Sequence, residues 1–224
     1  MFGQNIKEPP VKSDKGYLDV YKIFSTIQGE GVYSGYPAIF IRLSGCNLAC
    51  TFCDTAFDKK NQMSLNDIII EIDAIVCKFP NISLIVITGG EPMRQDIRGL
   101  CNILISKNFK VQIETNGTIY REINNNVKII CSPKCSSNNK YYIVDQRMVD
   151  QIDIFKFIIS ASENYKEYSN VPDIYNKYNI PIYIQPMDEY NKEKNIQNYR
   201  LCVSLSMNMG YIISLQTHKI LNIE

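Results

Sequence analysis

The chain has 224 residues, 45% of them hydrophobic, and its 24 basic and 23 acidic side chains leave a net charge of +1. This length suffices for one domain with a buried core, and the near-neutral charge gives no overall attraction to nucleic acid or to anionic membranes. The first 16 residues are polar and include two prolines, so we expect no signal peptide, no membrane span and a cytoplasmic location.

Eight cysteines in such a chain favour metal binding or redox chemistry over a disulfide framework. Cys46, Cys50 and Cys53 fall within a stretch of eight residues and form the cluster of interest. Cys131 and Cys135 either flank a binding turn or belong to a second metal site whose other ligands are not visible. Three isolated cysteines are expected to be small buried hydrophobic residues: Cys77, Cys101 and Cys202.

Residues 1–16 form a polar lead-in, and we expect a single domain over residues 17–224. In chain order, the pattern predicts strands at Leu18–Ser25 and Ala38–Leu43, a helix at Leu65–Phe79 with Ser64 as N-cap, a strand at Leu84–Thr88, a helix at Gln95–Lys107, strands at Lys110–Glu114, Val127–Cys131 and Ile154–Ile159, a helix at Glu163–Tyr178, a strand at Ile180–Gln185, a helix at Glu193–Met207 and a strand at Tyr211–Leu215. The strands are continuous apolar runs, typical of strands covered on both faces.

This alternation of strands and helices predicts an α/β fold with a parallel sheet and right-handed crossovers. About six to eight such units suit an incomplete or compact (βα) barrel, because a complete barrel needs about 250 residues. A flat, doubly wound sheet is the alternative. In both folds ligands bind at the carboxyl ends of the strands, and the most polar motifs of the chain follow predicted strands.

The motif GCNLACTFCDT, residues 45–55, supplies three thiols from one loop with the spacing C-x3-C-x2-C. Structural zinc needs four protein ligands, and no fourth is evident nearby, because the lone histidine, His218, lies far along the chain. A four-iron cluster held by three cysteines leaves one iron open to another ligand. A zinc loop and incidental thiols are the competing interpretations.

The spacing, with Phe52 before the last cysteine, resembles the radical S-adenosylmethionine (SAM) superfamily. The resemblance implies a 4Fe–4S cluster whose open iron binds SAM and whose electron splits it into a hydrogen-abstracting radical. It also implies that Phe52 packs near the adenine and that Cys53 and Asp54 contact SAM.

Three further motifs end predicted strands, and each alone would be an ordinary turn. In the superfamily, the motif ITGGEP corresponds to a SAM contact through the backbone of Gly90, with Glu91 in support. The side chains of ETNG, residues 114–117, would face the SAM ribose. In CSPK the resemblance assigns SAM contacts to Ser132, Pro133 and Lys134.

The stretch FSTIQGEGVYSGYPAIFIRLSGCNLACTFCDT, residues 24–55, together with IYIQPM and ISLQTHKILNI, resembles the 7-carboxy-7-deazaguanine synthase family. That resemblance implies a lyase that contracts the ring of 6-carboxy-5,6,7,8-tetrahydropterin with loss of ammonia. It also implies that SAM is regenerated, that Mg²⁺ holds the substrate, that flavodoxin or ferredoxin donates the electron, that the chain is a homodimer, and that the product feeds deazapurines such as queuosine in tRNA.

Within this family, Arg42 offers a planar cation for the pterin carboxylate, and Gln28 with the backbone of Ile27 and Gly29 offers an amide for the pterin edge. Two threonines complete the predicted site: Thr88 as a substrate contact and Thr55 as a Mg²⁺ ligand. We expect His218 to line the pocket or to tie down the last helix rather than to act in catalysis.

Two other functions compete with the synthase. A glycyl-radical activase uses the same cysteine spacing but acts on a protein, so it needs no closed small-molecule pocket. A zinc-stabilised binding module would have no catalytic role.

Overall fold

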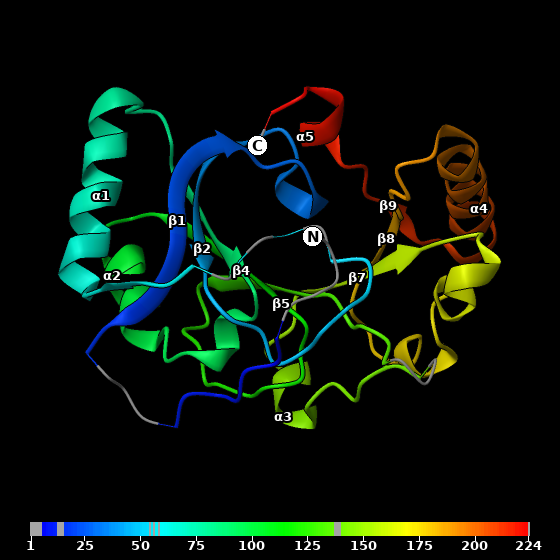
Figure 1. Cartoon of the computed structure of the whole chain (residues 1–224), viewed down its shortest axis with the longest axis horizontal. Helices are drawn as coiled ribbons and strands as arrows, with labels where there is room; N and C mark the ends of the chain where they lie inside the picture. Colours follow the sequence, from blue (N-terminus) through cyan, green and yellow to red (C-terminus); the bar gives the residue numbers. More distant parts are fainter. Residues whose placement is uncertain are drawn as a thin grey trace.

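The computed structural model describes residues 6–12, 16–53, 55, 57, 59–136 and 140–223. One nine-stranded sheet with the order β3-β1-β2-β4-β5-β6-β7-β8-β9 dominates it (Figure 1). In chain order the strands are β1 (Leu18–Ile27), β2 (Pro37–Leu43), β3 (Asn61–Met63), β4 (Leu84–Gly89), β5 (Lys110–Thr115), β6 (Val127–Cys131), β7 (Ile154–Ile159), β8 (Ile182–Pro186) and β9 (Ile212–Ile213).

The predicted incomplete barrel is confirmed: seven strands from β2 to β9 run parallel, and the edge strands β3 and β9 do not pair with each other among the described residues. The sheet is therefore open. β1 departs from the predicted pattern because it runs antiparallel to both of its neighbours. A short connection reverses the chain between β1 and β2, whereas a parallel pair needs a crossover of a dozen or more residues.

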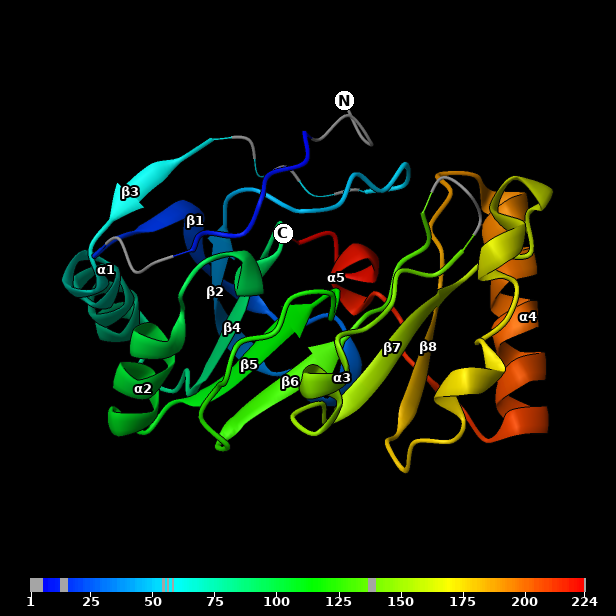
Figure 2. The ribbon, with the colours of Figure 1, turned by 90° about the horizontal axis from the view of Figure 1, so that it is seen from below.

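The longer helices lie at the two ends of the sheet (Figure 2). α1 (Leu65–Lys78) and α2 (Arg98–Ser106) lie at one end, and α4 (Lys192–Met209) lies at the other. The short helices are α3 (Gln146–Val149) and α5 (Thr217–Ile220), and the 3₁₀ turns are η1 (Gly31–Tyr33), η2 (Pro92–Arg94), η3 (Glu163–Tyr168) and η4 (Asp173–Tyr175). α1 begins where the sequence predicts, because Ser64 and Asp67 form a reciprocal capping box. None of the described helices combines the length and apolar content that crossing a membrane requires.

One predicted helix and one predicted burial are wrong. Residues 163–178 form the two separate 3₁₀ turns η3 and η4, since Pro172 removes a helical donor and disfavours helical backbone in Val171 before it. Cys77 is exposed on α1, whereas the other two isolated cysteines, Cys101 and Cys202, are buried as expected.

Part of the polar lead-in packs against the cysteine loop, residues 45–53. Lys7 pairs with Cys46 in an isolated β-bridge, and the Glu8 amide donates to the Cys46 carbonyl at 2.7 Å. The Val11 amide donates to the Arg94 carbonyl at 2.8 Å. Residues 6–12 therefore lie beside the loop that carries the thiols, while the predicted domain bounds remain a prediction.

Candidate active site

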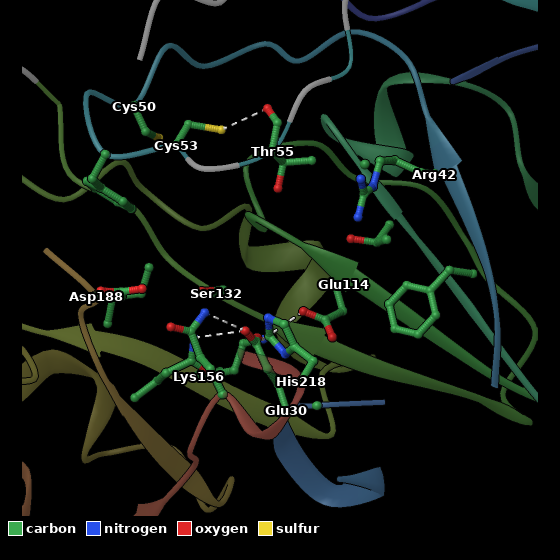
Figure 3. A pocket seen from close by; sticks show the side chains of 18 of the residues that line it. Glu30, Arg42, Cys50, Cys53, Thr55, Glu114, Ser132, Lys156, Asp188 and His218 are labelled. Carbon is green, nitrogen blue, oxygen red and sulfur yellow. Dashed lines mark hydrogen bonds and ion pairs between the residues drawn. The ribbon is translucent and has the colours of Figure 1, made fainter. Parts of the chain in front are cut away.

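A pocket of about 530 Å³ reaches from the cysteine loop to the loop after β1 (Figure 3). The cysteine loop lies at the carboxyl edge of the parallel strands. Gln28 and Gly29 come from the opposite edge, because β1 is antiparallel and Ile27 pairs with Pro37 at the start of β2. The sequence predicted ligands only at the carboxyl edge, so the contribution of the loop after β1 is an addition to the predicted site.

This pocket brings together most of the residues selected from the sequence. Its lining includes Ile27, Gln28, Gly29, Arg42, Cys46, Cys50, Phe52, Cys53, Thr55, Thr88, Gly90, Ser132 and Lys134. Pro133 is buried but is not part of the lining, and Asp54 lies outside the described residues. Their individual roles remain predictions.

The two glycines of ITGGEP let β4 approach the backbone of the cysteine loop. A Cβ on Gly89 would lie 2.1 Å from the Leu43 carbonyl oxygen, and a Cβ on Gly90 would lie 1.9 Å from the Gly45 carbonyl oxygen. Two hydrogen bonds hold this contact, from the Gly90 amide to Leu43 at 3.1 Å and from the Glu91 amide to Gly45 at 3.0 Å. Side chains at either glycine would push the loop away.

Arg94, in η2, supports the start of the cysteine loop. Its guanidinium donates to the Ser44 carbonyl at 3.1 Å and to the Pro9 carbonyl at 3.3 Å. The same group lies 3.2 Å from the Glu8 carboxylate and 3.7 Å from that of Asp19. With 3% of its surface exposed, Arg94 joins the lead-in, β1 and the loop through one buried cation.

Asn47 attaches the other side of the loop to the turn after β5. Its side-chain amide donates to the Thr118 hydroxyl at 2.8 Å, and its side-chain carbonyl accepts from the side-chain amide of Asn116 at 3.0 Å. The cysteine loop is thus held by two neighbouring turns of the same sheet edge, which fixes where its thiols face.

The three clustered cysteines are half-buried thiols rather than disulfides. Burial raises the pKa of Cys46 to about 12 and also raises the pKa of Cys50, which the nearby Lys134 ammonium opposes. Among the described residues, no three His, Cys, Asp or Glu side chains converge closely enough to hold a single metal ion. Three soft thiol donors from one loop fit a multi-iron cluster that leaves one iron open to another ligand.

Glu91 is a fully buried carboxylate whose hydrogen bonds organise the ETNG turn. It accepts from the Thr115 hydroxyl at 2.6 Å, from the backbone amide of Asn116 at 2.7 Å and from the backbone amide of Met93 at 2.9 Å. Burial raises its pKa, against these three donors. Thr115 therefore faces Glu91 and Asn116 faces Asn47, and both residues also line the pocket.

A buried charge cluster that was not predicted from the sequence lies at the far side of the pocket, and we call it the Glu30–Lys156–Glu114 cluster. The Lys156 ammonium lies 2.6 Å from a carboxylate oxygen of each glutamate. Burial alone would lower the pKa of Lys156, but attraction to Glu114 and Glu30 raises it. The signal was present in the sequence as a lysine inside the apolar run IFKFII.

The C-terminal segment closes the pocket from the side of the loop after β1. The Thr217 amide donates to the Gly29 carbonyl at 2.9 Å, and the Gln216 amide donates to Glu30 at 2.9 Å. Gly29 lies so close to His218 that a Cβ would be 2.0 Å from the imidazole Nδ1. His218 lines the pocket, one of the two positions that the sequence allowed it.

An open, largely parallel sheet with a three-thiol loop at its carboxyl edge is the architecture of the radical SAM superfamily, and the model of that superfamily matches residues 40–184. The superfamily implies a 4Fe–4S cluster and SAM as cofactors. The 7-carboxy-7-deazaguanine synthase of Rickettsia prowazekii (strain Madrid E) is 46% identical over 228 residues, covering 100% of this chain and 96% of the relative. The chain belongs to the 7-carboxy-7-deazaguanine synthase family, as the resemblance of its motifs predicted.

Two further comparisons agree. The synthase of Rhodospirillum rubrum is 32% identical over 244 residues and is covered completely, as is this chain. The crystal structure of QueE from Escherichia coli superposes with a TM-score of 0.73 at 25% identity, covering 89% of this chain and 94% of that one.

Proposed function

We propose that this chain converts 6-carboxy-5,6,7,8-tetrahydropterin to 7-carboxy-7-deazaguanine with release of ammonia. One observation carries the proposal: a single pocket joins the three-thiol loop to Arg42, Gln28 and Thr88, in a chain that matches named synthases along its whole length. A pocket of about 530 Å³ suits a small molecule. A glycyl-radical activase, which acts on a protein, would not need this enclosure.

Cys46, Cys50 and Cys53 would hold the cluster, which together with SAM supplies the radical that starts the reaction. Gly90 would present its backbone to the SAM amino acid portion from the end of β4. Ser132 and Lys134 border the same pocket, where the Lys134 ammonium donates to the Ser132 hydroxyl at 2.5 Å and to the Ser132 carbonyl at 2.7 Å.

Arg42 and Thr88 would bind the pterin carboxylate side. They are cross-strand partners of β2 and β4, so both side chains reach the pocket from one place in the sheet. The Arg42 guanidinium lies 5.1 Å from the ring centroid of Phe24, which orients its planar fork. Gln28, with 2% of its surface exposed, would read the polar pterin edge.

Thr55 would bind Mg²⁺ beside the cluster. It lines the pocket next to Cys53, and its hydroxyl is the hard oxygen ligand that Mg²⁺ prefers. Substrate oxygens and water would complete the octahedral shell. From the family resemblance we also propose flavodoxin or ferredoxin as electron donor, a homodimer, a cytoplasmic location, and a product that feeds deazapurines such as queuosine.

The test is a turnover assay of anaerobically purified, reconstituted protein with a chemical reductant, SAM, Mg²⁺ and the tetrahydropterin. We expect a brown protein with iron and sulfide near parity, formation of 7-carboxy-7-deazaguanine and ammonia by mass spectrometry, and little net consumption of SAM. Release of 5′-deoxyadenosine without the deazaguanine would reduce the assignment to the superfamily alone. A colourless zinc protein would refute the cluster.

A further inference from the structure

A charged side chain interrupts the buried strand β7. Lys156 lies between Phe155 and Phe157, which are fully buried and pack on Tyr175, whereas Lys156 faces the pocket with 4% of its surface exposed. Removing an ammonium group from water is costly unless carboxylates and hydrogen bonds replace its hydration. The contacts of Lys156 therefore indicate what the charge is retained for.

One ammonium joins two carboxylates from distant parts of the chain (Figure 3). Glu114 belongs to β5, and Glu30 belongs to the loop after β1, which is 126 residues from Lys156 in sequence. Four glutamine amides donate to the two remaining carboxylate oxygens at 2.9 to 3.2 Å: Gln185 and Gln216 to Glu30, and Gln28 and Gln112 to Glu114. The cluster thus links β5, β7 and β8 to the loop after β1 and to the C-terminal segment.

The charge balance of the cluster explains why a cation is needed. Two carboxylates that share one ammonium leave a net charge of −1 among these three groups. Without the ammonium, the like charges of Glu30 and Glu114 would repel each other in a buried site, and one carboxyl would retain a proton to higher pH. A protonated carboxyl would lose acceptor capacity toward N–H groups in the pocket.

We propose that Lys156 is a positioning residue for substrate binding, which holds Glu30 and Glu114 together as hydrogen-bond acceptors and closes the loop after β1 against the sheet. The proposal rests on the proposed function, because the ligand it serves is a pterin whose pyrimidine edge carries N–H donors. Lys156 itself acts through the two glutamates and not on the reacting atoms.

Other titratable groups face the cluster from neighbouring elements. Lys134, from the segment after β6, interacts with Glu114 and with Lys156, and His218, from α5, interacts with Glu30. Asp188 follows β8 and pairs instead with Lys219 at 2.9 Å. Lys134 and His218 could also contribute to a change in pH response when the Lys156 charge is removed. A second substitution within the Glu30–Lys156–Glu114 cluster therefore tests whether the two glutamates cause that change.

The test compares Lys156→Met with Lys128→Met in the reconstituted enzyme. Lys128 is a matched control, since it lies on the neighbouring strand β6, pairs with Asp153 at 2.7 Å and does not line the pocket. For Lys156→Met we expect unchanged iron content and a rise in KM for the tetrahydropterin of about tenfold or more. Its KM should fall as pH rises between about 6 and 9, because binding improves when both carboxyls ionise. The parent and Lys128→Met should show no such trend.

A double variant separates positioning from general damage. In Lys156→Met/Glu30→Gln only one carboxylate remains, so the pH trend in KM should disappear even though binding stays weak. An unchanged KM in Lys156→Met, or an identical pH trend in the single and double variants, would overturn the proposal.

A ligand-free measurement keeps this result distinct from failure of the proposed function. Hydrogen exchange of the holoenzyme should be faster in residues 27–36 and 214–223 of Lys156→Met than in the parent or in Lys128→Met. If the parent does not turn over the pterin but this difference appears, the proposed function fails while the closing role of Lys156 stands. Equal exchange in all three proteins would refute that role.

Discussion

Gly90 shows how a single missing side chain shapes the site. The space that a Cβ would need is occupied by the backbone of Gly45, at the start of the cysteine loop. Backbone atoms at that position cannot move without displacing the thiols that follow. The absence of a side chain at Gly90 therefore allows the end of β4 and the cysteine loop to approach closely, in addition to the predicted contact of Gly90 with SAM.

Gly90→Ala should destabilise the protein by about 3 kcal/mol and reduce its iron content, because the new methyl group overlaps the loop backbone. Gly99→Ala is the control: its Cβ would meet only the tip of the Leu65 side chain at 3.0 Å. We expect that control to stay within about 1 kcal/mol of the parent. Denaturant unfolding and iron analysis measure both effects. Equal stability of the two variants would contradict the packing argument.

Cys50→Ala should lose the cluster and all cleavage of SAM, since two thiols cannot replace the set of three. Cys101→Ala removes a buried thiol of α2 outside the pocket and should keep the iron. Iron and sulfide content, visible absorbance and 5′-deoxyadenosine formation provide the readouts. A Cys50→Ala protein with a complete cluster and turnover would remove Cys50 from the ligand set.

At the scale of elements, η2 and the lead-in act together as a support for the cysteine loop. The buried Arg94 of η2 touches Glu8 and Pro9 on one side and Ser44 on the other. The segment that follows the motif ITGGEP therefore makes a structural contact with the lead-in. This contact was not predicted, because the polar lead-in gave no sign of packing.

Arg94→Met should cost about 3 kcal/mol, since it leaves carboxylates and a carbonyl without their buried cation. Arg98→Met removes an ion pair whose arginine side chain is 55% exposed and should cost less than about 1 kcal/mol. Urea unfolding of both variants, with iron retention during exposure to a chelator, tests the difference. An equal loss of unfolding free energy in the two variants would show that the burial of Arg94 does not contribute to stability.

The elements were predictable where one local signal decides them. Apolar runs located every strand except β3, a short edge strand of polar residues. The helices α1 and α2 were also found, because their apolar spacing is regular. α4 was predicted as well, although its apolar residues form no clear stripe. Residues 163–178 have suitable spacing for a helix, but buried tyrosines hold two 3₁₀ turns there. The antiparallel direction of β1 was missed, because the strand was predicted to end at Ser25 rather than Ile27 and the connection to β2 therefore looked longer than it is.

At the scale of the whole molecule, an open sheet needs another way to enclose a pocket. Here the C-terminal segment crosses from β9 to the loop after β1 (Figure 1). The Ser214 hydroxyl accepts from the Gly31 amide at 2.8 Å, and Gln216 bonds to Glu30. These contacts bring together two chain segments that belong to opposite ends of the sheet.

Acid should weaken this closure through Glu30. Burial by itself raises the pKa of Glu30, but the Lys156 ion pair and hydrogen bonds lower it from 4.5 to about 2. The stabilisation is therefore complete above about pH 4.5 and is lost as pH falls toward 2.

In urea unfolding of the protein without its iron–sulfur cluster, Glu30→Gln should be less stable than the parent at pH 6. The difference in the free energy of unfolding should shrink as pH falls toward 3. Glu163→Gln is the control, because that side chain is 85% exposed and pairs only across one helical turn. A pH-independent difference for Glu30→Gln would contradict the lowered pKa.

The amino-acid sequence by itself determined the cofactor chemistry and the family, because three thiols, two glycines and their spacing are local features of the chain. It also placed most pocket residues, since strands that run parallel bring their following loops to one edge. Only the tertiary structure decided how the pocket is closed. The Glu30–Lys156–Glu114 cluster joins residues up to 126 positions apart, and such a contact depends on the pairing and direction of whole strands rather than on neighbouring residues.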